Sequence, residues 1–419
     1  MRRAGRLREL LVSAVVDSFG MALGWTVVVL LATARGGLVE AALYNAAMLA
    51  GVVLSAPVTG WLAGRLAGRT LLRGAAGVEG LLRFGVLYGL VAGLPAELIA
   101  IGIVVMHVAA WAGFAGMRAE VTAVDTSPRS MTRYAVSIAG VEATGTALAA
   151  LLPKGPAGYP TGWLLIAVFV VYAGSLLPTV ITARRARISP RLDQGSAPNR
   201  ATGPAPHAGQ GRLSGRRAVH PPGWGPAPRL PGGRQSALLL AAGGGVMLVA
   251  AGPALLAVPV IEQLHGHGWV AGGAIAFSIG TLLSTRAVEA IRKHQLPAVL
   301  RWSVWGLGML VGWVFAPGYA PMVLVAQFAA GLSQTAFEGD MDAQVAAKAE
   351  PSSVTRDLAY SASVRALGGA LSVRALPMLV AAPAIGMVAS VASLALGITT
   401  LLLWAAFAAV PQLFRRLAG

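Results

Sequence analysis

The chain contains no cysteine and carries unusually little charge. The lack of cysteine excludes disulfide bonds, thiol catalysis and cysteine-ligated metal sites. Only 12 % of the 419 residues are charged, whereas a soluble globular protein carries about 25 %. Apolar residues make up 56 % of the chain, and its mean hydropathy is +0.69. This balance cannot cover a water-facing surface, and it predicts an all-α polytopic membrane protein in a lipid bilayer.

The net charge of +17 does not indicate a nucleic-acid partner, because the basic residues fall between long apolar blocks. Twelve such blocks are each long enough for the ~20 residues that cross a bilayer as a helix. They cover residues 10–33, 38–63, 71–93, 96–117, 133–152, 161–182, 236–261, 268–285, 297–316, 319–337, 356–376 and 381–409. The first block contains Asp17 and exceeds the roughly 7–15 apolar residues of a signal peptide, so we interpret it as a span. Pro253 and Pro259 should interrupt the seventh span.

Residues 184–235 separate the spans into two sets of six. This segment is rich in proline, glycine and arginine and has almost nothing to bury, which is typical of a disordered linker. The sequence therefore predicts an N-terminal half over 1–183, a basic cytoplasmic linker, and a C-terminal half over 236–419.

The distribution of basic residues predicts the orientation in the membrane. With the N-terminus inside, 28 of the 33 basic residues lie on the cytoplasmic side, and the outer loops hold only Arg35 and Lys154. Positive charge stays preferentially on the cytoplasmic face. We expect a multi-pass protein of the cytoplasmic membrane with both termini inside.

An internal repeat relates the two halves at a constant offset of 223 residues. Residues 128–148 and 351–371 share ten identical positions out of twenty-one, whereas composition alone would give two or three. Each stretch is the loop into a span followed by that span, the fifth in one half and the eleventh in the other. Halves repeated in the same orientation are typical of transporters with a midplane site.

The layout resembles the major facilitator superfamily over the whole chain. That family's signature between spans two and three, Gly-x-x-x-Asp-Arg-x-Gly-Arg-Arg, is matched here by Gly60, Arg65 and Arg69. Gly64 replaces the aspartate and Ala67 the second glycine, so the motif is degenerate and its usual gating ion pair cannot form. The resemblance implies two pseudo-symmetric six-helix halves and a monomer that moves a small molecule.

Other family signatures are present only in part. Asp17 to Leu23 resembles the acidic start of span one in many bacterial members. Proton-driven members often carry an arginine in span four, where this chain offers His107. The fifth span has Gly140 and Gly145 but lacks the internal proline of drug antiporters.

Ionisable residues inside spans are costly unless they are paired or wetted, so each is a functional candidate. Asp17 is a candidate proton carrier or an acid paired with a local arginine. Glu142 and Arg365 are equivalent in the repeat, and we expect both to face one central cavity. There Glu142 would accept a proton or a cationic group, and Arg365 would hold an anionic group. A structural ion pair between the halves is the alternative.

Further polar residues complete the set of candidates. Glu79 and Arg83 lie one helical turn apart, which predicts a structural ion pair. His107 is a candidate for proton coupling or a neutral, hydrogen-bonded histidine. Gln327 and Gln334 give the tenth span a polar stripe suited to a substrate surface. An acidic cluster after that span is expected to be solvated, or else to pair with Arg65, Arg69 or Arg356; it comprises Glu338, Asp340 and Asp342.

The sequence contains no catalytic constellation, phosphate loop or metal-spaced histidines in a span, so we expect neither an enzyme nor a cofactor or bound metal. The leading hypothesis is a secondary transporter driven by protons, with export of a small organic compound favoured by the resemblance. A proton-coupled or facilitated importer of a metabolite and a non-transporting membrane protein of the same fold are the alternatives.

Overall fold

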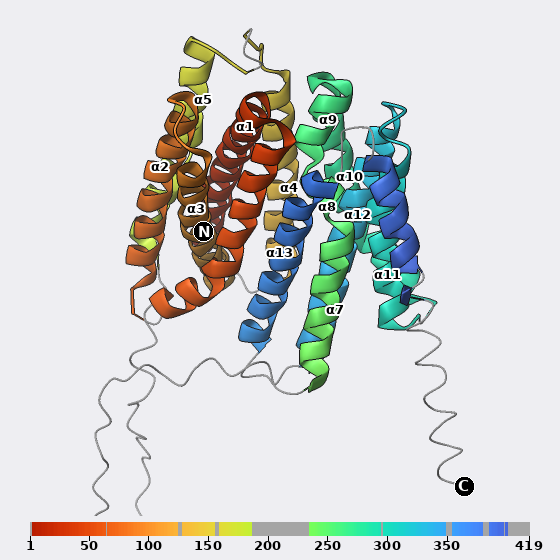
Figure 1. Cartoon of the computed structure of the whole chain (residues 1–419). Coiled ribbons are helices and arrows are strands. Elements are labelled where there is room, and N and C mark those ends of the chain that lie inside the picture. Colours follow the sequence, from red (N-terminus) through yellow and green to blue (C-terminus); the bar gives the residue numbers. More distant parts are fainter. Residues whose placement is uncertain are drawn as a thin grey trace, which may run out of the picture.

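The computed structural model describes residues 2–63, 65–124, 128–155, 159–186, 234–294, 296–348, 354–379, 385–397 and 399–400. These residues form helices that run roughly parallel to one another (Figure 1). The helices of the first half are α1 (Arg2–Ala63), α2 (Gly68–Val91), α3 (Ala96–Val124), α4 (Pro128–Leu151), α5 (Trp163–Gly174) and α6 (Leu177–Thr182). The second half holds α7 (Arg234–Ala250), α8 (Gly252–Leu255), α9 (Ala257–His265), α10 (His267–Arg292), α11 (Ala298–Leu310), α12 (Met322–Lys348) and α13 (Val354–Leu379), and a further short apolar helix covers Ile385–Gly397. The predicted linker, at 184–235, lies almost wholly outside the described residues.

The element α1 contains the first two predicted spans. Its backbone leaves helical geometry at Gly36 and Gly37, and Gly37 has a φ of 65°. A positive φ is accessible to glycine without the Cβ clash of other residues. Arg35 holds the turn by pairing with Glu40 at 2.6 Å and by donating to the Leu94 carbonyl at 2.9 Å. The turn thus lies between the predicted spans 10–33 and 38–63.

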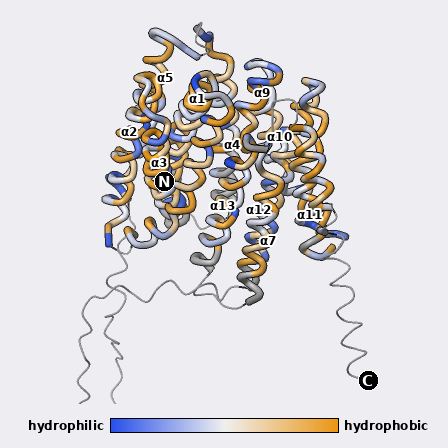
Figure 2. The backbone as a smooth tube through the Cα atoms, viewed as in Figure 1, coloured by the Kyte–Doolittle hydropathy of each residue, from blue (hydrophilic) through white to orange (hydrophobic). Residues whose placement is uncertain are grey.

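Five helical stretches of the described residues are long and apolar enough to cross a membrane: Gly5–Leu62, Gly68–Val91, Ala96–Arg118, Trp163–Arg185 and His267–Ile291. Hydrophobic residues follow most of the length of the helices (Figure 2). Large apolar side chains such as Leu81, Phe84 and Ile166 are exposed on α2 and α5. Exposed side chains of this kind suit contact with lipid. The protein is therefore an integral membrane protein with several spans.

Two predicted spans show where the helices break or extend beyond the apolar residues. The seventh is interrupted as its prolines predict, because α7 ends at Ala250, α8 begins at Gly252 and α9 begins at Ala257. The fourth extends beyond the predicted end at residue 117, because α3 continues to Val124. This extension brings Arg118, assigned to a loop from the sequence, into the helix.

The two halves meet along two helix pairs. The second part of α1 packs along α13, and α4 packs along α10. The Ser363 hydroxyl donates to the Val53 carbonyl at 3.5 Å, and the Ser278 hydroxyl donates to the Ala139 carbonyl at 3.4 Å. Figure 1 shows α4 and α13 in the middle of the molecule, between the remaining helices of the two halves. Each pair therefore joins one helix of each half near its midpoint.

The repeat appears in the packing as two equivalent close helix contacts. A Cβ on Gly145 of α4 would lie 2.8 Å from the Phe19 carbonyl oxygen of α1. A Cβ on Gly368 of α13, its repeat partner, would collide with the Gly244 carbonyl oxygen of α7. Small residues allow such close approach between helices in membranes. The shared glycine thus sets the same type of contact in both halves.

Candidate functional site

A cavity of about 340 Å³ lies between the two halves. One wall is α4 of the first half, and the opposite walls are α8, α9, α10 and α12 of the second half. Apolar side chains line much of it, including Val258, Ile261 and Phe277. A concave, largely apolar space with a few convergent polar groups is the usual form of a small-molecule site.

Glu142 supplies the charge in this cavity. It lies near the middle of α4, and its side chain is exposed although it lies far from either end of the helix. Of the described residues that line the cavity, Glu142 is the only charged one. Arg118 of α3 interacts with it electrostatically without lining the cavity. The carboxylate is thus in a position to contact a ligand.

Two glutamines of α12 face the same cavity, as the polar stripe in the sequence predicts. Gln327 is 3 % exposed, and its amide nitrogen has no hydrogen-bond partner among the described residues. Gln334 donates from its amide nitrogen to Glu338 at 3.2 Å. The structure therefore brings Glu142, Gln327 and Gln334 together around one space.

We expected Arg365 to face the same cavity as Glu142, and the structure places it elsewhere. It is absent from the described lining of the cavity. Its guanidinium instead contacts Asp342 of α12 at 2.6 and 3.2 Å and the Ser361 hydroxyl at 2.7 Å. The repeat correctly equates Arg365 with Glu142, but α13 lies against α1 and α7 whereas α4 borders the cavity. The acid paired with Arg365 is therefore on α12.

The acidic cluster after the tenth predicted span is also different from the solvated loop that we expected. Because α12 continues to Lys348, all three acids lie in the helix. Asp340 is 1 % exposed and accepts from Arg301 at 3.0 Å and from the Trp302 indole at 3.0 Å. These contacts, with those of Glu338 and Asp342, replace the predicted partners Arg65 and Arg69; the Arg356 side chain lies outside the described residues. Asp340 and Asp342 thus join α12 to α11 and α13, whereas Glu338 pairs with Gln334 within α12.

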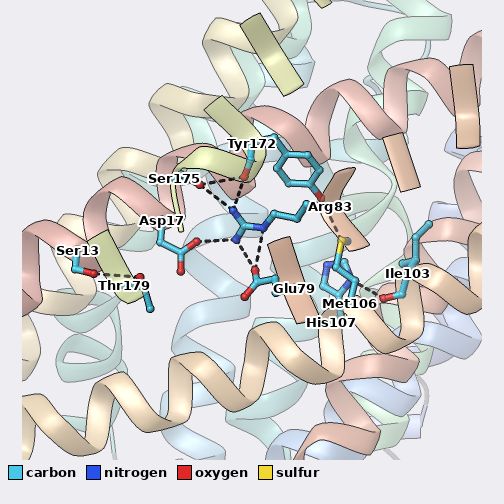
Figure 3. A network of polar contacts seen from close by, with 10 residues as sticks. All are labelled: Ser13, Asp17, Glu79, Arg83, Ile103, Met106, His107, Tyr172, Ser175 and Thr179. Carbon is cyan, nitrogen blue, oxygen red and sulfur yellow. Dashed lines mark hydrogen bonds and ion pairs between the residues drawn. The ribbon is translucent and has the colours of Figure 1, made fainter. Parts of the chain in front are cut away.

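A buried ionic cluster lies in the first half (Figure 3), and none of its described residues lines the cavity. Arg83 of α2 is fully buried and pairs with Glu79, as the sequence predicts. It also donates to Asp17 of α1 at 2.6 Å, to the Tyr172 carbonyl at 2.8 Å and to the Ser175 hydroxyl at 2.9 Å. These contacts use all five donors of a guanidinium. Arg83 therefore ties α2 to α1 and to the break between α5 and α6.

His107 of α3 is buried near this cluster. Its Nδ1 is 2.9 Å from the Ile103 carbonyl oxygen. The ring meets the Trp25 ring edge-on, with centroids 4.9 Å apart. These contacts fit the alternative interpretation of His107 as a neutral, hydrogen-bonded histidine. A role of His107 in proton coupling stays a prediction.

The degenerate loop motif lies at the end of α1 and the start of α2. Gly60, Arg65 and Arg69 are all exposed. The Arg65 guanidinium lies over the Trp61 ring, 4.1 Å from its centroid. Gly64, the replacement for the family's aspartate, lies outside the described residues. A gating role for these residues stays a prediction.

An ion pair that we did not predict joins the halves at one end of the cavity. Lys154, directly after α4, contacts Glu262 of α9 at 2.5 Å. Both side chains are partly buried, and Gln263 lies close to the Gly36–Gly37 turn of α1. We call the Lys154–Glu262 pair the outer latch, because the sequence predicts that this end faces outward. In the sequence, Lys154 is one of only two basic residues in the predicted outer loops, and this unusual position could have marked it as a functional candidate.

Comparisons with known proteins identify the fold. No protein-family model and no curated protein matches the sequence. Solved structures match it along nearly its whole length. The nucleoside transporter NupG has 11 % identity and a TM-score of 0.63, covering 96 % of this chain and 99 % of that one. The inward-open xylose transporter XylE from E. coli has 13 % identity and a TM-score of 0.61, covering 94 % and 95 %. A bacterial homologue of the iron transporter ferroportin, inward-facing, has 12 % identity and a TM-score of 0.62, covering 95 % and 97 %. The chain has the all-helical major facilitator fold, as the resemblance in the sequence predicted.

Proposed function

We propose that this chain, with its major facilitator fold, is a secondary active transporter that exports a small organic molecule in exchange for protons. The observation that carries the proposal is the cavity between the halves, with an exposed carboxylate near the middle of α4, the helix of the fifth predicted span. Ionisable groups at that depth are typical of substrate and ion pathways. The neighbours in fold are described as a nucleoside transporter, a xylose transporter and a bacterial homologue of an iron transporter, which supports solute transport as the class of function.

Alternating access is supported by how the halves meet. The pairs α1–α13 and α4–α10 each join one helix of each half, so one half can rock against the other about these contacts. At one end the outer latch holds the halves together. We infer that this arrangement is the inward-facing state, in which the cavity is closed to the outside. Breaking the latch is then part of the change to the outward-facing state.

Proton coupling is supported by the imbalance of charge around Arg83. Two carboxylates, Asp17 and Glu79, share one guanidinium in a buried position. An uncompensated buried charge is costly, and a proton bound by either acid neutralises the cluster. Asp17 lies on α1, which also packs against α4 and α13. A change in its protonation is therefore placed to affect the contact between the halves.

Flux measurements in liposomes test the proposal. The purified protein would be reconstituted with a pH-sensitive dye inside, and candidate compounds would be added with and without an imposed pH gradient. We expect gradient-driven flux with the unchanged protein, a loss of proton coupling in Asp17→Asn and a loss of flux in Glu142→Gln. Glu289→Gln, which removes an exposed acid at the far end of α10, is the matched control and should keep full flux.

The outcomes separate the parts of the proposal. Coupled flux that survives both substitutions would exclude the proton-carrier assignment. A folded protein that moves no compound would favour a non-transporting role. Proton-coupled accumulation in the direction of the proton gradient would identify an importer.

A further inference from the structure

We propose that the cavity selects a monovalent organic cation that also carries a hydrogen-bond acceptor. This substrate class deepens the proposed transport function and rests on it. Three features of the cavity support this substrate class: its charge, a buried donor that has no partner among the described residues, and its apolar wall.

The charge of the cavity favours a cation. Glu142 is the only charged residue among its described lining, and no basic side chain is part of that lining. Arg118 interacts electrostatically with Glu142 and so reduces the negative potential in the cavity. Arg118 itself is not part of the described lining. A cationic ligand would be attracted by this carboxylate, an anionic one would be repelled by it, and a neutral one would gain nothing from its charge.

The buried amide of Gln327 requires an acceptor. Within the described part of the chain its nitrogen has no hydrogen-bond partner, although the residue is 3 % exposed. Buried polar groups are nearly always hydrogen-bonded, so an orphaned donor that faces a cavity indicates a missing partner. A carbonyl or ether oxygen of a ligand would satisfy this donor.

Neighbouring hydroxyl groups are already engaged. Ser278 donates to the Ala139 carbonyl at 3.4 Å, Thr281 to the Gly331 carbonyl at 3.5 Å and Thr335 to Thr281 at 3.4 Å. The amide nitrogen of Gln334 is held by Glu338. Among these described polar groups, the Gln327 amide nitrogen is therefore the one without any hydrogen-bond partner.

The remaining wall fits an apolar or aromatic body. Phe277, Ile261 and Val258 line the cavity, whose volume is about 340 Å³. An aromatic ring can pack against the Phe277 side chain, while a cationic end meets Glu142 across the cavity. The ligand is thus an amphipathic organic cation of small size.

Equilibrium binding to the purified full chain in nanodiscs tests this assignment with matched probes. Benzoylcholine carries a permanent cation and an ester carbonyl, and 3,3-dimethylbutyl benzoate is its uncharged isostere. (4-Phenylbutyl)trimethylammonium keeps the cation without the carbonyl, and hippurate is an anion of similar size. We expect benzoylcholine to bind about tenfold more tightly than its uncharged isostere and hippurate to show the weakest binding.

Variants assign the contacts. Glu142→Gln should remove the preference for the cation, whereas Glu289→Gln should keep it. Gln327→Leu should remove the preference for benzoylcholine over (4-phenylbutyl)trimethylammonium, which we expect to be about fivefold in the unchanged protein. It should leave thermal unfolding unchanged or raise its midpoint, because it deletes an unsatisfied donor without leaving a cavity.

The outcomes distinguish the substrate class from the transport function. Equal binding of benzoylcholine and its uncharged isostere, or tighter binding of hippurate, would overturn the substrate class, even if proton-driven flux of other compounds is observed. Cation binding that depends on Glu142 without any flux in liposomes would retain the site and overturn the transport function.

Discussion

At the scale of single residues, the clearest feature is a guanidinium shared by two acids. Arg83 is fully buried, and its five donors are all used by Asp17, Glu79, Tyr172 and Ser175. Because the partners come from α1, α2 and the α5–α6 break, the contacts hold these segments in one arrangement. The cluster therefore acts on the structure of the first half as well as being a candidate for proton binding.

Removing Arg83 should be severely destabilising. Arg83→Met leaves two buried carboxylates without their cation, which costs about 3–5 kcal/mol when one partner of a buried pair is deleted. Thermal unfolding in detergent should show a large fall in the midpoint, while Arg286→Met, an exposed site on α10, should leave it unchanged. Adding Asp17→Asn and Glu79→Gln to Arg83→Met should recover most of the loss. A triple variant as unstable as the single one would contradict this electrostatic account.

Some residue positions could be predicted from the sequence and others could not. The spacing of Glu79 and Arg83 predicts their pairing, because residues four apart share a helix face. The third member, Asp17, is 66 residues from Arg83, so only the packing of α1 on α2 and α3 reveals it. The expectation that Arg365 lines the cavity was wrong, because the repeat shows which positions of the two halves are equivalent but not which helices border the cavity.

At the scale of helices, close contacts at glycine hold each half together. The pairs α1–α4 and α7–α13 meet at Gly145 and Gly368, where a Cβ would collide with backbone carbonyls. Backbone atoms cannot rotate away as a side chain can, so a larger residue at either position would force the two helices to shift apart. Both glycines are identical positions of the repeat between residues 128–148 and 351–371.

Substitution of the repeat glycines should separate the helices that they join. Gly368→Ala should destabilise the protein by about 1–3 kcal/mol through overpacking, seen as a lower midpoint of thermal unfolding. Gly140→Ala on α4 is the control, because a Cβ there meets nothing within 4 Å; it should be neutral or slightly stabilising, since alanine favours helix. Equal effects of the two substitutions would mean that the contact at Gly368 does not limit packing.

Boundaries of the helices were the less predictable part of these elements. Hydropathy places the end of the fourth span at residue 117 and that of the tenth at 337, but α3 and α12 continue to Val124 and Lys348. Polar residues after the apolar run keep helical geometry because they find partners, as Asp340 does with Arg301. Hydropathy measures how apolar a segment is, and it does not detect side-chain contacts of this kind.

At the scale of the whole molecule, the fold follows from features that the sequence carries at long range. Alternating apolar blocks, a basic segment in the middle and a repeat at a fixed offset together predicted the major facilitator arrangement that the solved structures share. The net charge of +17 does not indicate a nucleic-acid partner, and the distribution of the basic residues along the sequence instead predicts the orientation in the membrane. For the outer latch the sequence marks Lys154 as a basic residue in a predicted outer loop, but not its partner Glu262, which lies 108 positions away in the other half.

The outer latch should control the balance between the two states of the transporter. Lys154→Glu places two acids together and should disfavour the closed outer end by about 1 kcal/mol or more, the scale of a partly exposed ion pair. The rate of flux in liposomes should change. The charge-swapped double variant, Lys154→Glu with Glu262→Lys, should return it toward that of the unchanged protein. A double variant that behaves as the sum of two separate defects would argue against a direct interaction.

Side-specific labelling of the cavity tests the account of alternating access most directly. The chain has no cysteine, so Ala143→Cys, which lies beside Glu142 in the cavity, introduces a single reactive thiol. In liposomes of known orientation, a membrane-impermeant maleimide should label it from the predicted cytoplasmic side. After addition of Lys154→Glu, labelling from the outer side should rise. Labelling from neither side, or the same sidedness with and without the latch, would contradict a cavity that opens alternately to the two sides of the membrane.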